Sequence, residues 1–302
     1  MDGYLQQDLS ISRISRNPSH IYGVLVAARC LGMYFIAIAI VANFYTRSFV
    51  WVVISPLVLG IGGYRLQFIL HDTSHHSLFK SKRVNRTLGY LVGLLVGVDY
   101  KRYRFTHMWH HRRNGEQADP QIQDYLGSEP INRKQFIWFL FSPLIGSRLF
   151  PYLKREMTSR DIDGYDAPKS TTFWWIGFLT VQSALVFAMV SVSNRIEVPI
   201  FYYLGLSTTS LFLSRLRTLA EHQQVPPVDN DFSRSHKWNL FDWLFLYDAN
   251  FNLHFEHHLY PNLQTSELKQ VRNALLVSGK IGKEAPASMI QTIRSMYLSM
   301  SK

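Results

Sequence analysis

The stretch that decides the fold is "WVVISPLVLGIGGYRLQFIL" (residues 51–70), which continues directly into "HDTSHH" (residues 71–76). Its twenty residues carry one charge, Arg65. They are long enough to cross a bilayer as a helix, because the hydrocarbon core takes about 20 apolar residues at about 1.5 Å each. Three histidines and an aspartate follow at the end of this run. The pattern predicts a rigid membrane-spanning post that carries metal-binding side chains at the membrane surface.

Apolar runs elsewhere extend this pattern to an all-α integral membrane fold. Four spans in two hairpins are expected, at about 21–45, 49–70, 173–193 and 198–214. The stretches 88–98 and 136–146 are too short to span, and we expect buried or interfacial segments that could form the walls of a substrate tunnel. Arg29 and Arg65 are expected to extend toward the polar interface. Two long, nearly uncharged pairs of runs disfavour the alternative of a soluble helical protein with a large core.

Basic residues predict the orientation of these spans. The net charge is +11, with 16 Lys and Arg in residues 71–171 and 10 in residues 215–302. The two short turns hold one each, Arg47 and Arg195. Because basic residues stay on the cytoplasmic side, we expect both termini and a cytosolic helical cap (71–171 and 215–302) there, within one domain over 1–302. No nucleic-acid-binding pattern accompanies the charge, so nucleic acid is excluded as a partner.

Ten of the twelve histidines gather in three clusters and one single position. Positions i, i+3 and i+4 share a helix face, so the second and third clusters each direct three imidazoles the same way. In the first cluster His76 lies about 100° from His75 around the helix. All of these clusters lie on the predicted cytoplasmic side. The histidines are His71, His75 and His76; His107, His110 and His111; His222; and His254, His257 and His258.

So many imidazoles exceed the four ligands of a single zinc ion. Imidazole also suits iron, copper and nickel, and the single cysteine, Cys30, lies in an apolar run. Eight or nine converging nitrogens predict two metal ions with open coordination positions, and open positions on a redox metal indicate dioxygen chemistry. Five further residues are candidates for metal binding or for orienting a ligand: His76, Asp72, Glu221, Glu256 and Asn250. His20 and His236 match no cluster and are expected to be structural.

At these residues the chain resembles the integral-membrane fatty acid desaturase superfamily. The boxes "HDTSHH", "HMWHH" and "HFEHH" occur in the family's order, with Asp119–Pro120 after the second box. The third box lies within "NLHFEHHLYPNL", similar to the family pattern N-x-H-x-x-H-H-x-x-P. "RTLAEH" places His222 where the family has an additional ligand. The resemblance covers about residues 25–270.

The resemblance implies two iron ions, dioxygen as co-substrate, and removal of hydrogen from an unactivated C–H bond of an acyl chain. It implies a four-span helical fold with a cytosolic catalytic cap. The family's ligands, carried over residue by residue, are His71, His75, His107, His110, His111, His222, His254, His257 and His258. His76 is left over.

A separate electron donor is expected. The sequence has no haem-binding HPGG segment of cytochrome b5 type and no cysteine pairs of a fused ferredoxin. A carrier of ferredoxin, rubredoxin or cytochrome b5 type is therefore predicted. The basic stretches "KSKR" (80–83), "KRYR" (101–104) and Arg112–Arg113 could dock such an acidic carrier, or could serve only to set the topology.

Alternative functions remain open at this point. A hydroxylase or ketolase of a lipid, a carotenoid or another amphiphile would use the same histidine boxes. A zinc-dependent membrane hydrolase or a histidine-rich receptor would bind one zinc and leave several histidines unused. A catalytically inactive scaffold is disfavoured because every box is complete.

Overall fold

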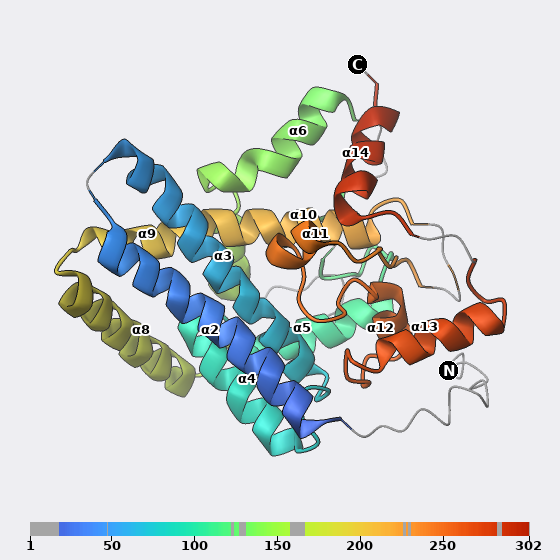
Figure 1. Ribbon diagram of the computed structural model, residues 1–302, viewed down its shortest axis with the longest axis horizontal. Helices are drawn as coiled ribbons and strands as arrows, with labels where there is room; N and C mark the ends of the chain where they lie inside the picture. The colour runs from blue at the N-terminus through green and yellow to red at the C-terminus, as the bar shows by residue number, and fades with distance from the viewer. Residues whose placement is uncertain are drawn as a thin grey trace.

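The structure is a computed structural model of the chain (Figure 1). It describes residues 18–46, 48–121, 124–126, 131–157, 167–225, 228, 231–282 and 286–301. Arg47 lies outside these residues. The described part of the chain is helical and has no strand, as predicted. Its helices are α2 (His20–Phe44), α3 (Phe49–Ser74), α4 (Lys82–Val96), α5 (Tyr100–Arg113), α6 (Arg133–Phe141), η2 (Ser142–Ile145), α7 (Leu149–Met157), α8 (Thr172–Ser193), α9 (Glu197–Gly205), η3 (Leu206–Ser210), α10 (Leu211–His222), α11 (Leu240–Phe245), α12 (His254–Leu259), α13 (Leu268–Val277) and α14 (Met289–Ser299).

Three helices of the described chain, α2, α3 and α8, are long and apolar enough to cross a membrane. Helix α2 begins where Ser19 accepts a hydrogen bond from the Tyr22 amide. Helices α2 and α3 are joined by a short turn and lie side by side in opposite directions (Figure 1). Helix α3 continues past the predicted end at residue 70 to Ser74, so His71 lies in the last turn of the same rigid helix and His75 is its C-cap residue.

The fourth predicted span, 198–214, is not one long apolar helix. Helices α9, η3 and α10 follow one another without a gap from Glu197 to His222, and η3 is a five-residue π-helical segment. The π turn interrupts the α-helical hydrogen bonding where this run packs on α3. The second half of the run is amphipathic rather than apolar, with Arg215, Arg217 and Glu221 in α10.

Small residues allow α3 and the α9–η3 junction to pack closely. A Cβ atom on Gly60 would lie 2.6 Å from the Gly205 carbonyl oxygen and 2.5 Å from the Thr209 Cβ. The Ser210 hydroxyl also donates to the Gly60 carbonyl at 2.7 Å. Close backbone approach through small residues is the usual way in which membrane helices associate. This contact fixes α10 relative to α3.

The short apolar stretch 88–98 forms the second half of α4 and the turn that follows it. Helix α4 packs on α3 and α8 and ends at Gly97, whose φ is 76°. Its last carbonyl groups accept hydrogen bonds from other helices: the Gln182 amide donates to Leu94 at 2.6 Å, and the Tyr202 hydroxyl donates to Leu95 at 2.6 Å. These bonds satisfy carbonyl groups at a helix end that is half-buried. The stretch 136–146 forms α6 and η2, with Ile137 and Trp138 exposed.

The prediction that Arg65 extends to the interface is wrong. Its side chain is fully buried, donates to the Trp243 and Tyr247 carbonyls at 2.8 Å, and forms an ion pair with Asp248. Arg29 of α2 pairs with the same carboxylate. A buried charge is costly unless it is paired and hydrogen-bonded, and Asp248 provides the opposite charge both for the buried Arg65 and for Arg29, whose side chain is 33% exposed. These two ion pairs with Asp248 attach the segment before the third histidine box to α2 and α3.

Candidate metal centre

Four helices bring the histidines of the boxes to one buried place. Helix α3 ends there with the first box, α5 carries the second, α10 ends at His222, and the short helix α12 is the third box itself. Eight of the nine predicted ligands are buried, and His111 is half-buried. Their imidazoles form two adjacent groups. The rings of His111 and His258, one from each group, lie 4.1 Å apart between centroids.

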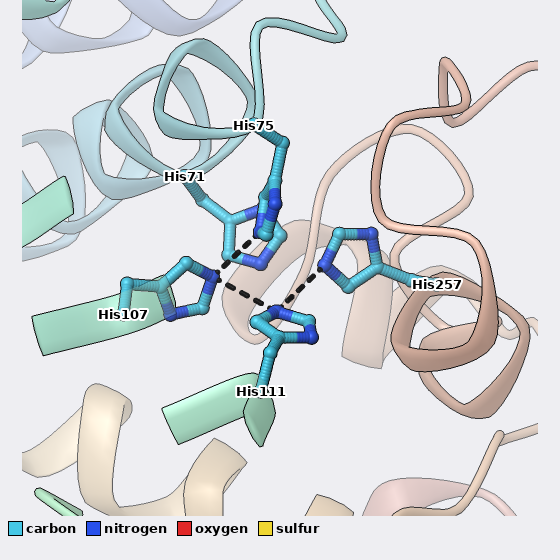
Figure 2. Close-up of side chains that lie close together, drawn as sticks. All are labelled: His71, His75, His107, His111 and His257. Atoms are coloured by element: carbon cyan, nitrogen blue, oxygen red, sulfur yellow. Dashed lines mark hydrogen bonds between the residues drawn. The ribbon is translucent and has the colours of Figure 1, made fainter. Parts of the chain in front are cut away.

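The five-histidine group consists of His71, His75, His107, His111 and His257. One nitrogen atom of each lies within 4.8 Å of the others. The Nε2 atoms of His75 and His107 are 2.9 Å apart, those of His107 and His111 are 3.2 Å apart, and those of His111 and His257 are 3.3 Å apart (Figure 2). Figure 2 shows the five rings pointing toward a common centre from three separate parts of the chain.

The four-histidine group consists of His110, His222, His254 and His258. His222 belongs to two overlapping sets of converging ligand atoms, one with His110 and His258 and one with His254 and Glu221. The Nε2 atoms of His222 and His254 are 2.9 Å apart. The Glu221 carboxylate lies 3.5 Å from His254 Nε2 and also accepts a hydrogen bond from Arg217 at 2.8 Å.

Helix geometry explains how the boxes divide between the groups. Residues i and i+4 are about 40° apart around a helix, whereas i+3 and i+4 are about 100° apart. Every i, i+4 pair accordingly stays in one group: His71 with His75, His107 with His111, and His254 with His258, whose ring centroids lie 4.6 Å apart. The i+3 residues, His110 and His257, reach the other group. The second and third boxes therefore each contribute to both groups.

Hydrogen bonds at Nδ1 direct Nε2 inward for several of these imidazoles. Asp119 lies 2.9 Å from His110 Nδ1, and Asp231 lies 3.0 Å from His258 Nδ1. The Phe232 carbonyl lies 3.2 Å from His222 Nδ1. Carboxylates and carbonyls in these positions fix the tautomer and ring orientation of a metal-binding histidine. The Asp72 carboxylate likewise faces His71 Nδ1, at a longer distance of 3.4 Å.

Burial keeps these imidazoles in the form that binds metals. It lowers the pKa of His222, His254 and His257 well below the usual value, and neighbouring imidazoles lower it further. The pKa of His258 is lowered by burial too, although Asp231 opposes the shift. Burial opposes ionisation of Asp231, yet His258 and hydrogen bonds from Ser233 and Asn114 bring its pKa to about 2. Neutral imidazoles beside an ionised carboxylate are the donor set that a cation requires.

The two groups fit metal ions. Nitrogens that bind one ion at about 2.1 Å lie about 3.0 Å apart at right angles and about 3.4 Å apart in a tetrahedron, and the Nε2 separations of 2.9–3.3 Å match this range. His71 Nε2 and His258 Nε2 are buried without a hydrogen-bond partner in the described chain. A buried polar atom without a partner is costly, and one ion in each group would satisfy these two nitrogen atoms.

Comparisons with known proteins agree with this geometry. The sequence model for "Fatty acid desaturase" matches residues 47–279, which is most of the chain. The chain belongs to the fatty acid desaturase family. It is 26% identical over 231 residues to "Fatty acid desaturase" of Bacillus subtilis (strain 168), covering 68% of this chain and 62% of that protein. It is 32% identical over 142 residues to "sn-1 acyl-lipid omega-3 desaturase (ferredoxin)" of Synechocystis sp. (strain ATCC 27184 / PCC 6803 / Kazusa), covering 44% and 38%. The chain thus spans less than two thirds of the length of either relative.

The remaining candidate ligands of this desaturase-family protein, and the two histidines outside the boxes, lie outside the two histidine groups. His76 has a φ of 56° and joins neither group. Glu256 pairs with Arg272 at 2.7 Å and accepts from Ser235, and Asn250 donates to the Thr265 carbonyl. Neither belongs to the converging sets of ligand atoms, and their role in binding or orienting the metal ligands stays a prediction. His236 is buried between the Ala220 and Ala287 carbonyls, and His20 is exposed at the start of α2.

Three orienting groups are not predicted by the sequence pattern. Asp119 was visible only as part of the Asp119–Pro120 dipeptide after the second box, and its contact with His110 was not foreseen. Asp231 and the Phe232 carbonyl lie in the loop after α10, where no spacing relates them to a histidine box. A carbonyl group carries no signal in the side-chain sequence.

A cavity of about 650 Å³ reaches the five-histidine group. Its wall includes His107, together with Tyr103 and Thr106 from the preceding turn of α5. Val96, Gly97 and Val98 also line it, so the predicted tunnel stretch 88–98 does contribute to its wall. The stretch 136–146 contributes none of the described residues in this wall. Its Trp138, Phe139 and Ser142 line a second, smaller hollow of about 590 Å³.

Proposed function

We propose that the chain is an O2-dependent membrane oxidase that desaturates a fatty acyl chain with two iron ions. The observation that carries the proposal is the convergence of nine imidazoles, eight of them buried, into two adjacent groups beside a largely apolar cavity. Its family membership and the names of both relatives support the same reaction. The five-histidine group would hold one iron. The four-histidine group, with Glu221 close by, would hold the other.

Bound iron would supply dioxygen activation and the capacity to remove hydrogen from an unactivated carbon. The chain itself would hold each imidazole neutral and turned inward. Asp119, Asp231 and the Phe232 carbonyl perform this for three imidazoles of the four-histidine group. Burial of the ligands also excludes water, which strengthens the interaction of the carboxylates with the cations.

The cavity would position the acyl chain. Its wall combines Leu70 and His107 near the five-histidine group with Phe178, Ile200 and Leu204 among the spans. An acyl chain that extends from the spans to His107 passes the imidazoles that would hold the first iron. Binding sites of this size are usually apolar with few polar groups.

A separate electron donor belongs to this proposal. We propose a carrier of ferredoxin, rubredoxin or cytochrome b5 type, and the printed name of the Synechocystis relative includes ferredoxin. Exposed Lys82, Arg83 and Arg86 at the start of α4, with Arg112 and Arg113 at the end of α5, give a basic surface that suits an acidic partner.

The same proposal includes the membrane topology. Helices α2, α3 and α8 would span, and the run from α9 through η3 to about residue 214 in α10 would cross as the fourth span, with its π turn inside the membrane. Residues 71–171 and 215–302, with 26 of the 32 Lys and Arg residues, would face the cytoplasm together with both termini.

Expression in a host of known lipid and pigment composition tests the function. The wild-type chain should produce an acyl species two hydrogens lighter, seen by mass spectrometry, only when oxygen is supplied. A matched His107→Ala strain should lack it. Lipids or pigments that gain oxygen instead would favour the hydroxylase or ketolase reaction. Purified protein with one tightly bound zinc and activity without oxygen would overturn the proposal.

A further inference from the structure

The cavity follows one helical run from the spans to the metal centre. Ile200 and Tyr203 of α9, Ser207 of η3, and Ser214 and Thr218 of α10 all line it. From residue 200 to residue 218 this run is about 27 Å long at 1.5 Å per residue. At its spanning end the lining is apolar, and Ile200 and Leu204 are also exposed on the outer surface. The polar end lies close to the metal ligands.

A buried cation, Arg215, lines the polar end. Its side chain is 4% exposed. One guanidinium nitrogen donates to the Phe139 carbonyl at 2.6 Å and lies 3.5 Å from the Ser142 hydroxyl. The guanidinium also covers the Phe139 ring, 4.2 Å from its centroid. Its Nε atom has no hydrogen-bond partner in the described part of the chain. Arg215 is therefore held firmly by neutral groups, and its charge is not neutralised by them.

The lining residues supply little negative charge to balance Arg215. Among the lining residues that the structure describes, Asp124 is the one carboxylate, and it forms an ion pair with Arg148. The guanidinium of an arginine is not deprotonated in proteins, so Arg215 is charged at neutral pH. A buried charge without an opposite charge is costly to the fold. A ligand that brings an anion would remove that cost.

We propose that Arg215 binds the anionic head of an acyl substrate, either the carboxylate of a free fatty acid or the phosphate of a phospholipid. The inference rests on the proposed function for the acyl tail and adds the class of head group. Arg215 lies seven residues before His222, about 10 Å along α10. A head group held there leaves the tail free to run past His107 toward the spans. The head group would thus set which part of the chain passes the metal centre.

Competition binding tests the proposal without any catalytic turnover. The full chain in lipid nanodiscs is loaded with a spin-labelled 16-carbon fatty acid, and its displacement is followed by the mobility of the spin label. The competitors are palmitate, its neutral methyl ester, and palmitoyl lysophosphatidate. The variants are Arg215→Gln and Arg215→Lys, with Arg195→Gln in the turn between α8 and α9 as the control.

The wild-type chain should bind palmitate or lysophosphatidate about tenfold more tightly than the ester, the size of a charge-assisted hydrogen bond. The anion preferred over the ester identifies the head group. Arg215→Gln should lose this preference and keep its affinity for the ester, which shows that the cavity is intact. Arg215→Lys should keep part of the preference, and the control should keep all of it.

No preference for either anion in the wild-type chain, or an unchanged preference in Arg215→Gln, would overturn the proposal. If Arg215→Gln binds none of the three competitors because α6 has lost a hydrogen bond, Arg215→Lys decides: a retained preference supports the proposal and a lost one overturns it. A chain that oxidises no lipid but shows the Arg215-dependent preference would remove the proposed function and leave this site standing.

Discussion

At the scale of single residues, Asp119 connects the second histidine box to the fold. Its carboxylate is fully buried, lies 2.9 Å from His110 Nδ1, and accepts hydrogen bonds from the Tyr125 hydroxyl and the Gln121 amide. In Asp119→Asn the amide would lose the charge that favours the His110 tautomer with Nε2 facing the metal. We expect activity or metal affinity to fall about 10–100-fold, measured by lipid turnover and by iron content.

Glu116→Gln is the matched control for Asp119→Asn. Glu116 lies three residues earlier in the same loop and pairs with Arg113 on the surface, where both side chains are about half exposed. An exposed ion pair contributes little to stability, so turnover should be unchanged. If Asp119→Asn retained full iron and full turnover, the orienting role of Asp119 would be wrong.

His222 and His76 give opposite predictions. His222 stands alone in sequence, yet its Nε2 lies 2.9 Å from that of His254, so His222→Ala should abolish turnover and reduce iron from about two to about one per chain. His76→Ala should keep both irons and measurable activity, because His76 joins neither group. His20→Ala is the control, and each variant must reach the membrane in normal amount. An iron-poor His76→Ala protein would mean that the first box uses a third histidine.

The sequence predicted which histidines converge and left their division between the two groups undetermined. The i, i+4 rule was already present in the spacing of "HMWHH" and "HFEHH", but the partner of each pair depends on how α5 and α12 face each other. That orientation comes from tertiary packing. The orienting groups Asp231 and Phe232 lie on a loop whose path after α10 no periodic pattern describes.

At the scale of helices, the contact between α3 and the α9–η3 junction positions two sets of ligands. Gly60→Ala would place a methyl group 2.6 Å from the Gly205 carbonyl oxygen and 2.5 Å from the Thr209 Cβ, so the helices must separate. Overpacking of this kind costs about 1–3 kcal/mol. We expect a lower unfolding temperature and weaker iron retention, because His71 and His222 lie at the ends of the separated helices.

Gly32→Ala in α2 is the matched control for Gly60→Ala. A Cβ atom at Gly32 meets no atom within 4 Å, and alanine favours a helix over glycine by up to about 1 kcal/mol. The unfolding temperature should therefore stay the same or rise. Equal behaviour of the two variants would show that α3 and α9 are less closely packed than the structure indicates.

The helices also show where apolar length predicts the fold and where it does not. Apolar runs of more than twenty residues predicted the bounds of α2, α3 and α8 to within a few residues. The run 198–214 did not give one helix, because the sequence "LGLSTTS" offers hydroxyl groups that bond to backbone carbonyls one turn earlier, as Thr208 does to Leu204 at 2.6 Å. Helix α4 was too short to span, and its half-buried end depends on Gln182 and Tyr202 from distant segments.

At the scale of the whole molecule, the number of membrane crossings determines whether the cap is on one side. The histidine boxes lie before α8 and after α10, so they share a side only if the run from Glu197 to His222 crosses back. Under the proposed topology, in which α8 crosses the membrane, the convergence of both parts in one candidate metal centre requires this. It cannot be read from hydropathy, because α10 is amphipathic and no single helix in this run is long enough.

Single-cysteine labelling tests the crossing directly, since the chain has one cysteine, Cys30, which is fully buried. Four exposed positions receive a cysteine in turn: Ser48, Lys82, Ile196 and Ser299. A membrane-impermeant maleimide applied to sealed vesicles of known orientation should label Lys82→Cys and Ser299→Cys from the cytoplasmic side only. It should label Ser48→Cys and Ile196→Cys from the opposite side only.

The side of the membrane from which Ser299→Cys is labelled tests whether the run from α9 to α10 crosses. If α9–η3–α10 does not cross, Ser299 would label from the same side as Ile196, and the two halves of the metal centre would lie on opposite faces of the membrane. Such a result would contradict the proposed four-span topology and would also be incompatible with the 2.9 Å contact between His222 and His254 and the 3.3 Å contact between His111 and His257 occurring in one site. Labelling of Lys82 and Ser299 from the same side therefore links the topology to the chemistry: the run that lacks the apolar character of a simple span would be the element that returns the third box to the first two.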